Sequence, residues 1–149
     1  MPDKETLERA REDREEGKSP STQAGEFVRE EMEHVREGKH GARSTKQAIA
    51  IGLSKARRAG VKLPPPGREK SSSATRRKAA RDTARAKRHK KTSRRRGRAT
   101  RKALRREGHS AASRKALARQ ARSSARKRGH AARSRAARKA ARTRKRNSS

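Results

Sequence analysis

Apolar side chains recur at helical spacing in one short part of the chain. They form a stripe at i, i+3 and i+4 positions that consists of Ala24, Phe27, Val28, Met32 and Val35. Ser19 and Pro20 predict the start of this helix, because serine caps helices and proline suits the first helical position. Gly38 predicts its end, where a left-handed residue is common.

A second helix is predicted over about 44–59. Ser44 and Gln47 fit a capping box, in which Ser44 caps the helix and Gln47 reaches back to the Ser44 amide. Gly60 predicts the end of this helix, and Val61 is expected to fold back onto its last turn. The two helices together predict a helical hairpin over about 19–63.

The hairpin has a small expected core. Gly52 allows a neighbouring helix to approach closely. The core residues are expected to be Phe27, Val28, Met32, Val35, Ile49, Leu53, Val61 and Leu63. So few apolar side chains rarely stabilise a lone hairpin. A homodimer through the Ile49 and Leu53 face, or through an exposed Ile51, is therefore a further expectation.

Residues 1–18 have the pattern of an acidic polar leader. Asp3 is a candidate N-cap and Gly17 a candidate stop, which predicts a helix between them. Leu7 is the one large apolar residue in this stretch, so no face of the helix requires burial. The leader is therefore predicted to form a marginal, fraying helix.

The rest of the chain has a different character. Residues 64–72 are rich in proline and serine and predict an extended linker. Residues 73–149 are rich in Arg, Lys and Ala, repeat short motifs at irregular spacing and contain Leu104 and Leu117 as their large apolar residues. Alanine and arginine favour helix, but like charges one turn apart repel. This tail is therefore predicted to be disordered and of low complexity, with transient helix.

Composition supports that fold class. Leu, Ile, Val and Phe number 11 among 149 residues, and the net charge is +33. A chain with few large apolar residues and a high net charge is typical of intrinsic disorder. The predicted fold is mostly disordered and otherwise all-α, with the short hairpin followed by the long basic tail.

Charge divides the chain and indicates a polyanionic partner. Residues 1–37 hold 12 acidic and 7 basic side chains, whereas residues 64–149 hold 34 basic side chains and three acidic ones. Lysine and arginine that neutralise phosphates release condensed counterions, which drives binding without a folded site. The acidic head either solvates its own helix or folds back on the tail and competes with nucleic acid. Both alternatives stay open.

The candidate contacts to nucleic acid are the clustered basic residues. They are Lys39, Arg43, Lys46, Arg57, Arg58, Arg76, Arg77, Lys78, Arg94, Arg95, Arg96, Arg101, Lys102, Arg105, Arg106, Arg114, Lys115, Arg126, Lys127, Arg128, Arg138, Lys139, Arg142, Arg144, Lys145 and Arg146. The loop 38–43 leads into a helix N-terminus, which is a recipe for binding phosphate. The alternative is a plain turn between two helices.

The missing aromatic residues favour DNA over RNA. Phe27 is the single aromatic residue, so the chain has no platform on which to stack unpaired bases. The predicted function is sequence-nonspecific nucleic-acid binding, in the form of DNA compaction or nucleoid association. An RNA- or ribosome-associated protein is the first alternative, and an interaction module for an acidic protein is the second.

Catalysis and metal binding are not expected. Glu30, Glu31, Glu33 and Glu37 crowd one helix, but no nucleophile or apolar cleft accompanies them. The chain has no cysteine, and no two of His34, His40, His89, His109 and His130 are three or four residues apart. We therefore expect no enzyme, no cofactor and no metal site, with the histidines exposed to solvent.

Two resemblances add to this interpretation. The run Gly-Lys-His-Gly-Ala-Arg-Ser-Thr-Lys-Gln, which continues from Gly38 to Gly60, resembles a segment of small basic bacterial proteins. Those proteins share a domain of unknown function, which would cover Ser21 to Leu63. The tail is similar in composition to the arms of bacterial linker-histone-like nucleoid proteins. The resemblances imply a bacterial source and supply no catalytic residue.

Location follows from the same features. The chain begins with an acidic, polar stretch, which is unlike a signal or transit peptide. Its longest apolar run, 48–53, is too short to cross a bilayer. We expect the protein in the cytoplasm, at the nucleoid, with no membrane association.

Overall fold

A computed structural model describes residues 1–88 and 93–148. His89 and the end of the chain at Ser149 lie outside the described residues. The described residues contain six α-helices and no strand, and about 76% of the chain is helical. In chain order the elements are α1 (Lys4–Glu15), α2 (Pro20–Arg36), α3 (Thr45–Arg58), the 3₁₀ turn η1 (Arg68–Lys70), α4 (Ser73–Arg88), α5 (Arg94–Leu104), the 3₁₀ turn η2 (Ser110–Ala112) and α6 (Arg114–Asn147).

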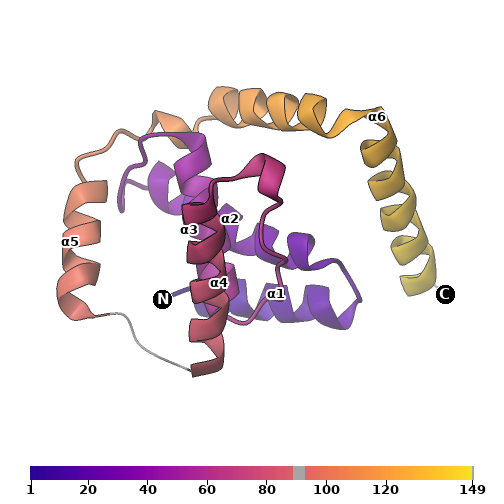
Figure 1. The fold of residues 1–149 in the computed structure, drawn as a ribbon, viewed down its shortest axis with the longest axis horizontal. Coiled ribbons are helices and arrows are strands. Elements are labelled where there is room, and N and C mark those ends of the chain that lie inside the picture. The colour runs from indigo at the N-terminus through magenta and orange to yellow at the C-terminus, as the bar shows by residue number, and fades with distance from the viewer. Residues whose placement is uncertain (89–92, 149) are drawn as a thin grey trace.

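Helices α1 to α4 form the body of the molecule. Each packs against the next in the chain, and the contact between α2 and α3 is the largest (Figure 1). The predicted hairpin is therefore present as α2 and α3. Among the helices of the described residues, none is both long enough and apolar enough to cross a membrane.

Local signals placed the hairpin ends correctly. Ser19 accepts a hydrogen bond from the Thr22 amide at 3.4 Å, with Pro20 at the first helical position. Gly38 has φ of +73°, and the amides beyond the helix end donate back into its last turn, as in a Schellman motif. At the end of α3 the Val61 amide donates to the Ala56 carbonyl at 3.0 Å, so Val61 folds back as predicted.

The core has two parts. Beneath α1 and the end of α3 lie Ala10, Ala24, Phe27, Ala56 and Val61, and between the hairpin and the η2 turn lie Met32, Val35, Ala42, Ala48, Ala111 and Ala112. Of the predicted core residues, Phe27, Met32, Val35 and Val61 are buried, and Val28, Ile49, Leu53 and Leu63 are half-buried. Ile49 and Leu53 contact these clusters within the same chain.

The expectation of a mostly disordered chain with a long tail is wrong, because the structure is a compact all-α fold. Helices α4, α5 and α6 occupy most of the stretch expected to be disordered and of low complexity. Counting large apolar residues missed the reason: most buried apolar residues here are alanines, which let helix backbones approach closely. Alanine and arginine are also strong helix formers.

The leader forms α1, and one of its faces is buried, which the sequence did not predict. Thr6, Ala10 and Asp13 of α1 are buried against the rest of the molecule, and Leu7 is half-buried. Asp3 occupies the N-cap position but makes no side-chain cap. Its amide donates instead to Glu30 Oε2 at 3.1 Å, which fastens the start of α1 to α2.

The segment between α5 and α6 docks on the turn between α2 and α3. The Gly41 amide donates to the Leu104 carbonyl at 2.9 Å, and the Ala42 amide donates to the Gly108 carbonyl at 3.0 Å. From α2, Arg36 Nε donates to the Ala112 carbonyl at 2.9 Å. These contacts join the basic half of the chain to the hairpin.

Helices α5 and α6, in the basic half of the chain, project from the body formed by α1–α4. Helix α5 stands apart from α1–α4 and has no buried residue (Figure 1). Helix α6 runs along one edge, bends at Gly129 (φ +73°) and continues in a second direction (Figure 1). Its last residues return toward the acidic end of α1, where Asn147 Nδ2 donates to the Glu16 carbonyl at 3.0 Å.

Candidate nucleic-acid interface

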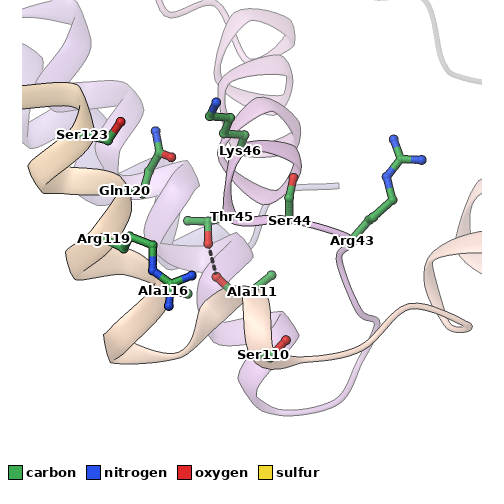
Figure 2. A pocket seen from close by; sticks show the side chains of 10 residues that line it. All are labelled: Arg43, Ser44, Thr45, Lys46, Ser110, Ala111, Ala116, Arg119, Gln120 and Ser123. Carbon is green, nitrogen blue, oxygen red and sulfur yellow. Dashed lines mark hydrogen bonds between the residues drawn. The ribbon is translucent and has the colours of Figure 1, made fainter. Parts of the chain in front are cut away.

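An open pocket of about 490 Å³ lies where the hairpin meets the basic half of the chain. It is lined by Arg43, Ser44, Thr45, Lys46, Ser110, Ala111, Ala116, Arg119, Gln120 and Ser123 (Figure 2). These residues come from the first turn of α3, the η2 turn and the first turns of α6. No acidic side chain is among them.

Two capped helix N-termini border this pocket. Ser44 accepts a hydrogen bond from the Gln47 amide at 3.2 Å, and Ser113 accepts one from the Ala116 amide at 3.2 Å. The first turn of α3 is fastened to the η2 turn, just before α6, because Thr45 Oγ1 donates to the Ala111 carbonyl at 2.7 Å (Figure 2). Helix N-termini carry a partial positive charge, so two of them beside one pocket favour an anion there.

Basic side chains add full charges to this arrangement. Lys46 and Arg119 lie on the α3 and α6 sides of the pocket and are exposed. Arg43 is also exposed, but its guanidinium points away from the α6 side in Figure 2. The lining of the pocket therefore carries basic side chains from both α3 and α6.

The predicted capping box forms only in part. Gln47 Oε1 accepts from the Arg43 amide at 2.7 Å and not from the Ser44 amide. The chain is extended at Ser44, which places the preceding amide within reach of the glutamine. The side chain of Ser44 still caps the helix as predicted.

The loop 38–43 is less available to phosphate than its sequence indicated. The Gly41 and Ala42 amides are used by the α5–α6 segment, and the Arg43 amide is used by Gln47. Lys39 is exposed and lies 2.9 Å from Glu37, whose hydrogen bond raises the pKa of Lys39. The pocket beside this loop is therefore a better candidate for a phosphate contact than the loop itself.

Three of the candidate residues are engaged in the fold. Arg57 is half-buried and donates to the Pro64 carbonyl at 3.3 Å. Arg58 donates to the Ser54 carbonyl at 3.2 Å and lies 4.0 Å from Asp82. Arg76 is half-buried and donates to the Ser71 carbonyl at 2.8 Å. They hold the linker and α4 against α3.

The remaining candidates on α4, α5, α6 and the segment between α5 and α6 are all exposed. They are Arg77, Lys78, Arg94, Arg95, Arg96, Arg101, Lys102, Arg105, Arg106, Arg114, Lys115, Arg126, Lys127, Arg128, Arg138, Lys139, Arg142, Arg144, Lys145 and Arg146. Within residues 1–88 and 93–144, the ion pairs take their basic partners from positions 9 to 58. The described basic residues from 68 to 144 therefore keep charges that no acidic side chain neutralises.

Two acidic residues of α2 are buried and do not form part of a solvent-exposed face. Glu30 and Glu31 are buried, and Lys55 Nζ of α3 lies 3.0 Å from Glu30 Oε1 and 2.8 Å from Glu31 Oε2. Burial works to raise the pKa of Glu30, but hydrogen bonds from Lys55 and the Asp3 amide outweigh burial and lower the pKa. Burial works to lower the pKa of Lys55, but its contacts with Glu31 and Glu30 outweigh burial and raise the pKa.

Two histidine side chains close to these buried residues are also largely buried, although the histidines were expected to be exposed to solvent. The side chains of His34 and His40 are each only 13% exposed, and their ring centroids are 6.2 Å apart. His40 Nε2 lies 2.9 Å from Glu31 Oε1, and His34 Nε2 lies 3.3 Å from Asp3 Oδ2. Sequence spacing missed this pair because the chain reverses at Gly38, between the two residues.

Comparison with known proteins gives one match. No curated protein and no solved structure matches the chain. Residues 17–67, which hold α2, α3 and the start of the linker, match a family of unknown function, DUF6496.

Proposed function

We propose that this protein binds nucleic acid without sequence specificity, with DNA favoured over RNA. The observation that carries the proposal is the exposure of most basic side chains between residues 73 and 144, which have no acidic partner among the described residues. Each such charge that meets a phosphate releases a counterion. A folded interface replaces the disordered arm as the binding element.

The pocket between α3 and α6 gives this interface a defined contact for the nucleic-acid backbone. Lys46 and Arg119 both line it, beside two helix N-termini, and contacts of this kind hold a backbone in register without reading bases. The projecting segments of α6 then extend the basic surface beyond the body of the molecule (Figure 1). Such a surface suits bridging or compacting of duplexes, and the proposed site of action is the nucleoid, in the cytoplasm.

A titration over a salt series tests the proposal. Full-length protein is titrated against labelled duplex DNA and structured RNA of equal length. If about 10 phosphates are neutralised, the slope of log K against log salt is near −9 on duplex DNA. A slope shallower than about −3 would contradict it. Tighter binding to the RNA would favour the RNA- or ribosome-associated alternative.

Matched variants locate the interface. Arg119→Gln and Lys46→Gln are each expected to weaken binding on every sequence and to reduce the salt slope by about 1. Arg29→Gln is the control, because Arg29 is exposed but paired with Glu33 at 3.1 Å. Equal effects of all three substitutions would remove the pocket from the interface. No effect of the first two would do the same.

A further inference from the structure

We propose that Glu31, His34 and His40 form a binding site for a divalent transition-metal ion, with Zn²⁺ as the best fit. One donor atom from each side chain lies within 4.8 Å of the others. Two imidazoles and one carboxylate are a common ligand set for zinc, which bonds to such atoms at about 2.0–2.2 Å. The side chains must close in by about an ångström to reach those bond lengths.

Glu31 shows why a cation belongs there. Its side chain is 1% exposed, and both carboxylate oxygens are buried without an aligned hydrogen bond. Burying a carboxylate without such bonds is costly. Lys55 Nζ lies 2.8 Å from Oε2, and His40 Nε2 lies 2.9 Å from Oε1.

His40 is oriented as a ligand. Its Nδ1 lies 3.0 Å from the Gly41 carbonyl oxygen, and because a carbonyl only accepts, Nδ1 carries the hydrogen of that bond. A neutral His40 therefore directs the Nε2 lone pair toward Glu31 Oε1, 2.9 Å away. A metal ion bound between them would be coordinated by both the His40 Nε2 atom and the Glu31 Oε1 atom. The hydrogen bond to the Gly41 carbonyl is the kind that fixes metal-binding histidines.

His34 completes the set from the same helix as Glu31. The two residues are three positions apart on α2, so their side chains share one face. Asp3 Oδ2, 3.3 Å from His34 Nε2, holds the ring from the start of α1.

The role of this site is structural. A metal ion held by Glu31, His34 and His40 would link α2 to the turn whose Gly41 and Ala42 amides bind the α5–α6 segment. Metal binding would therefore stabilise the docking of the basic half of the chain. Three protein donors leave a fourth tetrahedral position to water.

Direct titration of metal-free full-length protein tests this site. The readouts are calorimetric affinity for Zn²⁺, the melting temperature, and the ring-proton NMR signals of the histidines. We expect one Zn²⁺ per chain with Kd below about 1 μM, a higher melting temperature, and the largest shifts at His34 and His40. Mg²⁺, which prefers oxygen ligands, is expected to give none of these effects.

Variants decide whether the named residues hold the ion. His34→Gln and His40→Gln are each expected to weaken Zn²⁺ binding at least 10-fold, whereas His130→Gln, an exposed histidine of α6, leaves it unchanged. If a variant loses its helical signal, the NMR shifts of the unsubstituted protein decide the question. Binding weaker than about 100 μM, unchanged affinity in both folded variants, or a largest zinc shift at His130 would overturn the proposal.

Discussion

A Cβ atom on Gly41 would stand 1.9 Å from the Glu107 carbonyl oxygen. The turn between α2 and α3 and the segment after α5 therefore meet backbone against backbone. The contact leaves no room for a side chain at Gly41, because the nearest atoms belong to the main chain of Glu107 and Gly108 and cannot move aside by a rotamer change.

Gly41→Ala is expected to separate these two segments. The added methyl group forces the Gly41–Leu104 and Ala42–Gly108 hydrogen bonds apart, at a cost of about 1–3 kcal/mol. Hydrogen exchange should show faster exchange of the Gly41 and Ala42 amides. Gly108→Ala is the control from the partner segment, since a Cβ there meets nothing within 4 Å. Equal protection in the two variants would show that the segments do not dock.

The features that the sequence predicted well are those decided by nearby residues. Ser19 and Ser44 cap helices through amides three positions away, and the helix ends at Gly38 and Gly60 close within a single turn. Such signals act over one turn of chain, so their outcome does not depend on the rest of the fold.

The features that the sequence missed depend on distant contacts between small or polar residues. Ala111 and Ala112 complete a core with Met32 and Val35, although alanines in a basic tail give no hydrophobic signal. The pocket at α3 likewise required η2 and α6 to return to the hairpin. Arg43 and Lys46 were predicted as contacts. Arg119 was not, because the sequence does not show that the start of α6 lies beside the start of α3.

Gly52→Ala is expected to destabilise the α2–α3 pair. A Cβ on Gly52 would lie 2.7 Å from Val28 Cα and 2.9 Å from the Val28 amide nitrogen. The gain in helix propensity, about 1 kcal/mol, is smaller than the overpacking cost of up to about 3 kcal/mol. Gly25→Ala on α2 is the control, where a Cβ meets nothing and about 0.5–1 kcal/mol is gained. Denaturant unfolding that ranked the two variants the other way would contradict this packing.

Lys55→Met is expected to destabilise the protein by about 3–5 kcal/mol, because it leaves Glu30 and Glu31 buried without their cation. Adding Glu30→Gln and Glu31→Gln to Lys55→Met removes the unpaired charges and should recover part of the loss. The unfolding free energies of the single and triple variants measure the difference. A single variant within about 1 kcal/mol of the original protein would show that Lys55 is not the compensating charge.

Truncation after Gly129 separates binding from folding in the basic half. The removed segment, 130–149, holds eight basic residues, and its contacts at the end of α1 include the bond from Asn147 to the Glu16 carbonyl and the Arg146 guanidinium beside Gly17. The truncated protein should keep its melting temperature within a few degrees, since Ala111, Ala112 and Leu117 remain in place. The salt slope on duplex DNA should fall by up to about 7, if all eight charges contact phosphate.

Truncation after Leu104 is the contrasting variant. It removes both the cations of α6 and the residues that cover Met32 and Val35, so stability and affinity should fall together. If the truncation after Gly129 kept the full salt slope, the far segment of α6 would lie outside the interface, and binding would be confined to α4, α5 and the pocket at the start of α6. If that truncation lost its cooperative melting, the contact of α6 with the acidic end of α1 would be a necessary part of the fold.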